Sequence, residues 1–220
     1  MTVKVELISN NRPYTKLIPQ GMVVHETADP GATAQNLFDY WNKQYRGDSA
    51  NAVVDWNEAI QLIPNNEVAW HAGRTANLKF IGVELCRPAV HDEVKFNAVW
   101  DSAVKLFADI FIEQIKITTI TKDNLMSHAE VSAKWHETDH QDPVSYFKEY
   151  GKTVDDFRAA VQQRINDLKP SISLVDAVDI LVAKGIINTP GYWVQNAVIG
   201  KSVNGEYTGL LIRKIAEKLK

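Results

Sequence analysis

Phe80-Ile81-Gly82-Val83-Glu84-Leu85-Cys86 has the strongest strand pattern in the chain, and the expected fold is built around it. Its apolar character is interrupted by a single carboxylate, Glu84, and its length is typical of a strand. A strand of this kind belongs to a sheet that is covered on both faces. A carboxylate within it needs a partner or a chemical function, because burying an unpaired charge costs free energy.

Strand and helix patterns alternate on both sides of this stretch. Short apolar or alternating runs predict further strands at 1–8, 21–25, 52–55 and 59–63, the last two at a spacing suited to a hairpin. Apolar residues at helical spacing predict helices at 33–45, 94–115 and 154–168, with Thr33 as the N-cap of the first. This alternation indicates an α/β fold.

A second, smaller module is expected near the C-terminus. Lys169-Pro170-Ser171 has the composition of a linker, so we expect one domain at 1–168 and a small all-helical domain at 171–220. Three short helices are predicted in the small domain, one of them ending near Gly185. Residues 171–220 hold 6 Lys and Arg against 4 Asp and Glu, which leaves 18 of 24 and 23 of 27 for residues 1–170. The net charge therefore changes sign across the linker.

The composition excludes several classes of protein. With 45% hydrophobic and 23% charged residues among 220, the chain is an ordinary globular sequence and not a disordered one. A net charge of -3 gives no broad cationic field, so we expect no nucleic-acid partner. The single cysteine, Cys86, cannot form an internal disulfide. We find no membrane-spanning run and no signal-peptide pattern, and therefore expect synthesis in the cytoplasm.

Six histidines offer candidate metal ligands. His25 ends a predicted buried strand, and His128 opens a segment that runs to Asp142. A catalytic zinc ion takes three nitrogen, oxygen or sulfur ligands from the protein and keeps a fourth position open. Two histidines and one carboxylate brought together from distant strands would be sufficient for such a site.

His136-Glu137-Thr138-Asp139-His140 offers a competing site, because it matches the H-E-x-x-H signature of zinc proteases. The signature works on a stable helix, where both histidines project from one face. Here Gln141, Asp142 and Pro143 follow at once, and proline disfavours helical geometry in the residue before it. The protease is therefore kept as an alternative.

Seven short motifs occur in a fixed order between residues 20 and 147. They are VVHETA at 23–28, AVVD at 52–55, QLIP at 61–64, AWHAG at 69–73, IGVEL at 81–85, Ser127-His128 and Asp142-Pro143. As an ordered set, they resemble the type-2 N-acetylmuramoyl-L-alanine amidases. This family includes phage and prophage endolysins and bacterial autolysins, and it is related to the peptidoglycan recognition proteins.

The resemblance implies a central mixed β-sheet flanked by helices, with zinc in a surface cleft. By position, it implies that the zinc ligands are His25, His128 and Asp142, since members have cysteine or aspartate at the third position. Glu84 takes the place of a strand glutamate that assists catalysis in many bacterial and phage members. His140 departs from the pattern, because many members have lysine two residues before the third ligand.

These residue types also suit amide hydrolysis on chemical grounds. Zinc lowers the pKa of bound water toward about 7 and polarises a carbonyl. Glu84 is a candidate general base and proton shuttle, and His140 can stabilise the oxyanion. We expect His71 to line the cleft and bind substrate.

Each assignment has a structural alternative. Glu84 can serve only as the ion-pair partner of Arg74 or Arg87. His71 can merely satisfy a loop. Cys86 is expected to be a small buried hydrophobe rather than a reactive thiol.

The last fifty residues resemble, more weakly, small helical modules that follow such catalytic domains in endolysins, which implies binding to the cell wall. Tyr192, Trp193 and Tyr207 can stack on sugar rings, and a cationic helix end can meet anionic wall polymers. The alternative is that Trp193 and the leucines only form a miniature core. Because so small a core is marginal alone, docking or a homo-oligomer through this module is also considered.

The leading hypothesis is a zinc-dependent amidase that hydrolyses the bond between N-acetylmuramic acid and L-alanine of peptidoglycan, acting on the bacterial cell wall after release. The first alternative is a peptidoglycan-binding module without hydrolysis, which is disfavoured because all three ligand positions carry competent residues. The second alternative is the H-E-x-x-H protease.

Overall fold

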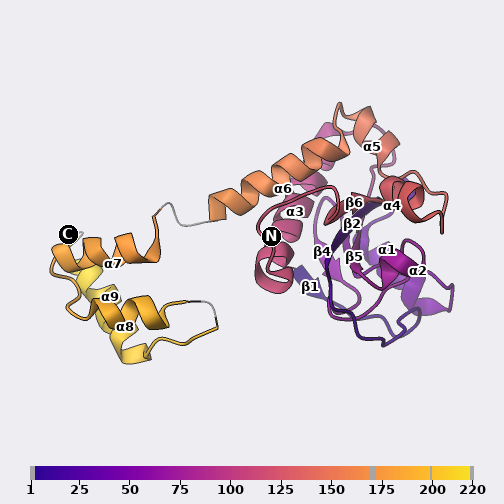
Figure 1. The fold of residues 1–220 in the computed structure, drawn as a ribbon. Coiled ribbons are helices and arrows are strands. Elements are labelled where there is room, and N and C mark those ends of the chain that lie inside the picture. Colours follow the sequence, from indigo (N-terminus) through magenta and orange to yellow (C-terminus); the bar gives the residue numbers. More distant parts are fainter. Residues whose placement is uncertain (1–2, 169–171, 199, 219–220) are drawn as a thin grey trace. The chain divides into compact units, whose positions relative to one another are not determined.

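One sheet of six strands forms the centre of the first part of the chain (Figure 1). The strands are β1 (Val3–Val5), β2 (Gly21–Glu26), β3 (Ala52–Val54), β4 (Ala59–Gln61), β5 (Phe80–Leu85) and β6 (Leu125–Ser127). They lie in the order β1-β4-β3-β5-β2-β6. Neighbouring strands are parallel except β3 and β4, which form the predicted antiparallel hairpin. The α/β fold with a mixed sheet is therefore confirmed.

The computed structural model describes residues 3–168, 172–198 and 200–218. The chain divides into two compact units, Met1–Leu168 and Lys169–Lys220. The predicted linker, Lys169-Pro170-Ser171, lies outside the described residues. That each unit folds independently stays a prediction.

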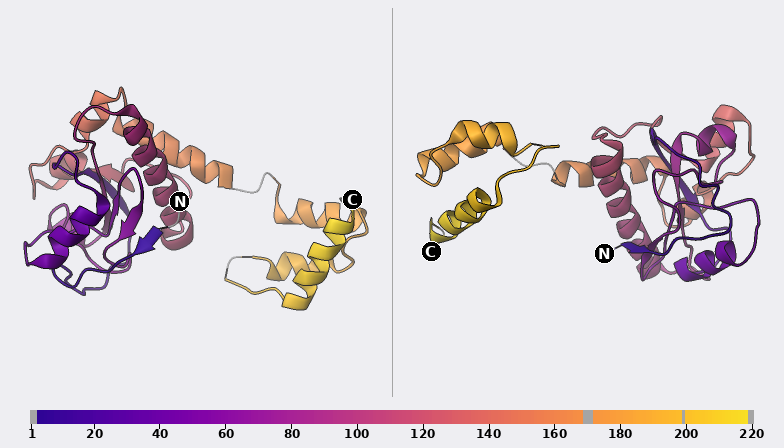
Figure 2. Two further views of the ribbon diagram at one scale, coloured as in Figure 1. Left: turned by 180° about the vertical axis from the view of Figure 1, so that it is seen from behind. Right: turned by 90° about the horizontal axis from the view of Figure 1, so that it is seen from below.

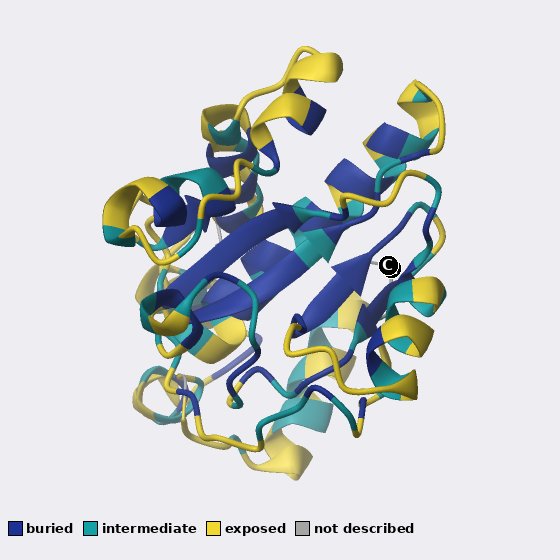
Figure 3. Ribbon diagram, turned by 90° about the vertical axis from the view of Figure 1, so that its right-hand side faces the viewer, coloured by how far each residue is buried: buried dark blue, intermediate teal, exposed yellow. Residues whose placement is uncertain are grey.

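Helices cover both faces of the sheet. They are α1 (Ala34–Lys43), α2 (Arg74–Asn77), α3 (Glu93–Ile110), the π-helical segment η1 (Phe111–Ile115), α4 (His128–Trp135), α5 (Val144–Glu149) and α6 (Val154–Leu168). Helices α3 and α6 lie on one side of the sheet, and α1, α2 and α4 lie on the other (Figure 1). The central strands are therefore buried, while the helices expose their outer surfaces (Figure 3).

Alternation along β5 separates the hydrophobic core from the candidate site. Ile81, Val83 and Leu85 pack into the core formed with α3 and α6. Successive side chains of a strand point to opposite faces, so Gly82 and Glu84 face the other side. The carboxylate in this apolar strand is thereby kept out of the larger core.

The end of the predicted helix at 94–115 differs in the structure. The α-helix stops at Ile110, and η1 continues to Ile115 before Lys116 adopts a left-handed conformation with φ of 65°. Ile112 and Ile115 still pack against the core. The apolar pattern therefore continues through residues 111–115, and it does not reveal that the helix changes there from α-helical to π-helical geometry. At the first helix the expectation holds, because Thr33 caps α1.

The described residues of the second unit form three helices, α7 (Leu174–Ala183), α8 (Pro190–Asn196) and α9 (Gly205–Lys218), which group together in Figure 2. Val178, Ile186, Ile187 and Trp193 form its small core. Gly185 follows α7 in a left-handed conformation with φ of 64°, as its sequence position indicates. Among the described residues, no helix is both long and apolar enough to cross a membrane.

A buried asparagine joins the centre of the sheet to the loop after the hairpin. Asn51 accepts a hydrogen bond from the backbone N–H of Gly82 at 3.0 Å. Its amide donates to the carbonyls of Pro64 and Glu67 at 3.3 and 3.0 Å. One side chain thus satisfies three backbone groups and holds β3, β5 and the loop together.

The substitution Asn51→Ala tests this junction. It removes a partner from three backbone groups, so we expect the free energy of unfolding to fall by about 2–4 kcal/mol. Urea unfolding measures the change, with Asn57→Ala in the exposed hairpin turn as the matched control. Equal unfolding midpoints for the two variants would contradict the prediction.

Candidate metal centre

Three neighbouring parallel strands end at one edge of the sheet and carry candidate residues there. His25 lies near the end of β2, in register with Glu84 of β5. On the other side of β2, β6 ends at Ser127, and His128 is the first residue of α4. Ligands of open α/β sheets bind beyond the carboxyl ends of the strands. The topology thus gathers three residues that are far apart in the sequence.

Hydrogen bonds fix the start of α4 and with it the position of His128. The Ser127 hydroxyl accepts from the backbone N–H of Glu130, whose carboxylate accepts from the N–H of Ser127. This is a capping box. Arg158 of α6, itself buried, donates to the Glu130 carboxylate and to the carbonyl of Leu125. The turn from strand to helix is therefore anchored to α6 as well.

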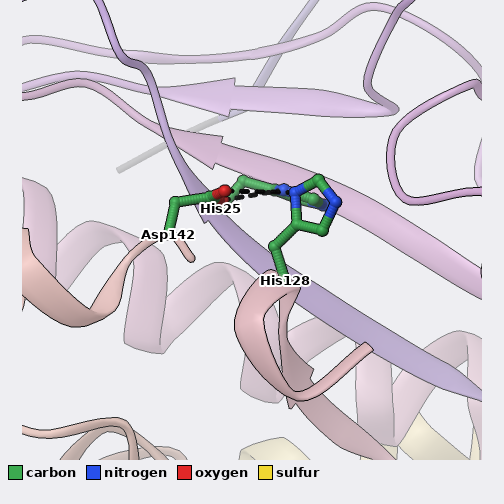
Figure 4. A group of neighbouring side chains, drawn as sticks. All are labelled: His25, His128 and Asp142. Atoms are coloured by element: carbon green, nitrogen blue, oxygen red, sulfur yellow. Dashed lines mark hydrogen bonds and ion pairs between the residues drawn. The ribbon is translucent and has the colours of Figure 1, made fainter. Parts of the chain in front are cut away.

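Asp142 comes from the loop between α4 and α5 and joins the two histidines (Figure 4). One carboxylate oxygen lies 3.1 Å from Nδ1 of His25, and the other lies 3.1 Å from Nδ1 of His128. One ligand atom from each of the three residues lies within 4.8 Å of the others. Two ring nitrogens and one carboxylate oxygen in this arrangement can hold a metal ion.

The charges of this cluster suit a metal ion. Burial opposes ionisation of Asp142, but the neighbouring His128 and His25 rings outweigh it and hold the pKa of Asp142 below its ordinary range. Burial lowers the pKa of His25, although Asp142 acts in the opposite direction. At neutral pH the cluster therefore contains an ionised Asp142 and a neutral His25, which are the forms that bind metals.

His71 is hydrogen-bonded to His25 within the protein. Its Nδ1 lies 3.0 Å from Nε2 of His25, and its Nε2 lies 3.1 Å from the carbonyl oxygen of Phe80. A Cβ at Gly82 would lie 2.4 Å from Cγ of His71, so this glycine makes room for the ring. Although His71 lines the cleft, both its ring nitrogens are in use. The expected binding of substrate by His71 stays a prediction, although neither ring nitrogen is left to hydrogen-bond a substrate.

These contacts determine the tautomer of His25. Burial lowers the pKa of His71 well below its ordinary value, so the ring is neutral. The Phe80 carbonyl only accepts, and therefore Nε2 of His71 carries the proton and its Nδ1 accepts from Nε2–H of His25. Nδ1 of His25 is then left with a free lone pair beside Asp142. Such outer partners orient metal-binding histidines.

Glu84 is half-buried and has no ionic partner among the described residues. Within the part of the chain that the structure describes, no ion pair joins it to Arg74 or Arg87, and its Oε2 has no hydrogen bond. Arg87 instead pairs with Glu26 and Glu149. Burial and nearby carboxylates, Asp142 first, raise the pKa of Glu84 well above its ordinary value. The structural alternative of a simple ion pair is therefore wrong, and Glu84 lies at the cleft wall without an arginine partner among the described residues.

His140 lies at the exposed side of the cluster. Its ring stacks on that of His128, with 4.7 Å between centroids, and its Nδ1 lies 3.7 Å from Asp142. Its side chain is 66% exposed, in contrast to the buried rings of His25 and His128. The ring is therefore available to a molecule in the cleft.

The H-E-x-x-H interpretation is wrong, because the required helix is absent from residues 136–140. Helix α4 ends at Trp135, and His136 follows in a left-handed conformation with φ of 56°. The segment continues as a loop to Asp142. Only His140 of the two histidines lines the cleft. The motif match is thus fortuitous, although Thr138 within it lies 3.2 Å from Nε2 of His128.

The cluster opens into a cleft of about 480 Å³. Its walls also contain residues that the sequence pattern does not single out, namely Glu26, Asn36, Tyr40, Asp48 and Trp70. Trp70 adjoins His71 in a quoted motif and offered a signal. Asn36 and Tyr40 are four residues apart on α1 and have the pattern of an ordinary polar helix face, so only the tertiary structure reveals them.

Comparison with known proteins follows this geometry. The sequence profile described as N-acetylmuramoyl-L-alanine amidase matches residues 14–145. The chain is 27% identical over 211 residues to protein Ami of Listeria monocytogenes, an alignment that covers 90% of this chain and 23% of that protein. It is 25% identical over 154 residues to the bifunctional autolysin of Staphylococcus aureus, an alignment that covers 66% of this chain and 12% of that protein. The chain thus spans less than a quarter of the length of these relatives.

Two solved structures share the fold. The hydrolase AmiA of Staphylococcus aureus, in complex with its ligand, superposes with a TM-score of 0.68 at 21% identity, over 75% of this chain and 83% of that chain. A mutant endolysin from Bacillus subtilis superposes with a TM-score of 0.59 at 27% identity, over 73% and 99%. The profile match covers more than half of the 220 residues and includes His25, Glu84, His128 and Asp142. The chain therefore belongs to the type-2 N-acetylmuramoyl-L-alanine amidase family.

Proposed function

We propose that this chain is a zinc-dependent amidase that hydrolyses the bond between the lactyl group of N-acetylmuramic acid and L-alanine in peptidoglycan. The observation that carries the proposal is the convergence of His25, His128 and Asp142 on the wall of an open cleft. Membership of the family supports the class of bond. The donor set supports the metal.

The three side chains suit zinc in particular. Imidazole nitrogens and a carboxylate oxygen are common ligands of catalytic zinc, which keeps a further position for water or substrate. The second nitrogen of each ring is already engaged, by His71 for His25 and by Thr138 for His128. Outer contacts of this kind hold metal-binding rings in place. When bound there, a zinc ion supplies Lewis acidity toward the scissile carbonyl and activates water for attack.

Glu84 manages the proton in this proposal. Hydrolysis adds the hydroxyl of water to the lactyl carbonyl carbon, breaks the carbon–nitrogen bond and moves one proton to the alanine nitrogen. Glu84 accepts the proton of the attacking water and donates it to the leaving amine. Its place on the cleft wall, next to His25 in the sheet, suits this transfer. The products are a lactyl carboxylate and a free alanine amine.

His140 and His71 receive different functions. The exposed His140 ring donates a hydrogen bond to the oxyanion that develops on the carbonyl, in the place where many family members have lysine. His71 is a positioning residue that fixes His25. A peptidoglycan receptor without hydrolysis would need neither the three metal-binding groups nor a half-buried Glu84 with no arginine partner, so the amidase is the better-supported function.

We further propose that residues 171–220 bind the bacterial cell wall, which the enzyme degrades in the manner of an autolysin or endolysin. Tyr207 and Lys214 of α9 line a groove of about 170 Å³ together with Trp193 of α8. Tyr207 is 48% exposed, whereas Trp193 mainly fills the core of this unit. An aromatic ring beside a cation suits a sugar of an anionic wall polymer. Because the alignment with protein Ami covers 90% of the chain, it extends into this unit.

Digestion of purified bacterial walls tests the proposed reaction. We expect the full chain to lower the turbidity of a wall suspension and a chelator to stop it, because zinc is required. Mass spectrometry should find new lactyl carboxylates and free alanine amines in equal amounts. New reducing ends of sugars would instead indicate a glycosidase and contradict the proposal.

The substitutions His128→Ala and His136→Ala form a matched pair for the same experiment. Both remove a histidine from 128–140, but only His128 belongs to the cluster. We expect His128→Ala to lose bound zinc and activity and His136→Ala to keep both. The opposite pattern would overturn the ligand assignment.

The substitution Glu84→Gln separates proton transfer from metal binding. Turnover should fall by roughly 10²-fold or more, since a general base is lost, while zinc content stays unchanged. In the wild type, the pKa of Glu84 is higher in the folded chain than in the unfolded chain. The free energy of unfolding therefore falls as the pH rises above the ordinary pKa of a glutamate, because the unfolded chain releases this proton more easily. With chelator present, Glu84→Gln should therefore be at least as stable as wild type at pH 8. Near-normal turnover would remove Glu84 from the reaction.

Truncation after Leu168 tests the function of the second unit. The candidate residues for chemistry all precede this point, so hydrolysis of soluble muropeptides should be unchanged. Sedimentation with intact walls should decrease, because Tyr207 and Lys214 are removed. A truncated chain that does not fold would show that the two-domain division is wrong.

A further inference from the structure

The 136–142 loop is tied to a distant segment by one carboxylate. Glu137 accepts a hydrogen bond from the backbone N–H of Thr75 at 2.6 Å and another from its hydroxyl at 2.7 Å. The two residues are 62 positions apart in the chain. Thr75 lies in α2, whereas the other hydrogen bonds of the loop to described helices run to α4 and α5, which flank it in the chain. Glu137 thus joins the loop to a separate part of the fold.

The loop carries three groups of the candidate metal centre. Thr138 contacts Nε2 of His128, His140 stacks on the same ring, and Asp142 contacts both His25 and His128. A shift of the loop would therefore move the expected ligand Asp142 and also Thr138, which contacts the second nitrogen of the expected ligand His128. The position of the loop decides whether the three ligand atoms remain together.

The segment on the other side of the contact leads directly from His71. The backbone N–H groups of His71 and Ala72 both donate to the side chain of Asn77, which fixes this turn. Gly73 follows with φ of 83°, and a Cβ there would lie 2.8 Å from Cβ of Glu137. Glycine is therefore required at position 73 for two reasons: the left-handed backbone conformation and the close approach of Glu137.

We propose that Glu137 is a positioning residue that, by binding Thr75, holds the 136–142 loop against the His71 segment and so sets the ligand geometry of the metal centre. The contact connects the outer partner of His25 with the loop that supplies Asp142 and Thr138. This inference rests on the proposed function.

Burial in a core does not explain this contact. The hydrogen bonds between Glu137 and Thr75 are exposed, and exposed pairs contribute little to global stability. Loss of the pair should therefore loosen the loop and leave the rest of the fold intact. A merely structural contact would change stability without a selective effect on the metal.

Hydrogen exchange followed by mass spectrometry tests the positioning of the loop. In the full chain with chelator, Glu137→Ala should speed exchange at 138–142 relative to wild type. The matched control is Asp123→Ala, which removes another exposed carboxylate, paired with Lys134 of α4. Thr75→Ser keeps both donors and should match wild type. Equal exchange in Glu137→Ala and Asp123→Ala would overturn the proposal.

Zinc affinity tests the consequence for the metal centre. By competition with a chromophoric chelator, Glu137→Ala should weaken zinc binding by about tenfold or more, as loss of outer-shell partners does. We expect kcat to fall, whereas KM and the melting temperature should stay unchanged. An unaltered zinc affinity, or a loss matched by Asp123→Ala, would overturn the inference. A wild-type chain that binds no zinc would overturn the proposed function instead, and exchange at 138–142 would still decide whether Glu137 holds the loop.

Discussion

The two close contacts of the Asp142 carboxylate with His25 and His128, each 3.1 Å long, are the interaction on which the site depends. They join the end of a central strand, the start of a helix and a loop that follows that helix. Burial opposes the charge of Asp142, and the two rings stabilise it. Without a partner of opposite or polar character, each of these buried groups would be costly. Each of the three side chains therefore depends on the other two for a polar partner, and a bound metal ion would interact favourably with all three.

The scaffold holds this cluster from several directions. Parallel pairing places the ends of β5, β2 and β6 side by side. Arg158 of α6 fixes the turn into α4, and His71 fixes the tautomer of His25. Gly82 contributes both to the sheet and to the site. Its N–H donates a hydrogen bond to Asn51, and the absence of a side chain leaves room for the His71 ring. The rigid sheet thus sets one half of the site, and the loop from α4 to α5 sets the other.

Family membership and site geometry support different parts of the functional account. The family match supports the type of bond that is hydrolysed. The geometry supports the proposed division of work within the cleft, with two histidines and Asp142 for the metal, Glu84 for the proton and His140 for the oxyanion. The relatives are several times longer than this chain, so the setting in which the activity is used belongs to the proposal.

The sequence alone determined the strand at 80–85, the hairpin and most helices, because apolar periodicity and capping residues act over a few positions. The ordered motifs also indicated the family, with His25, His128 and Asp142 as expected ligands. Three further facts became apparent only in the folded chain: residues 136–140 form a loop, both nitrogens of His71 are used internally, and Glu84 has no arginine partner among the described residues. The tertiary structure also revealed the contact of Glu137 with Thr75. These facts depend on contacts between segments distant in the chain, and local patterns carry no information about which distant groups meet.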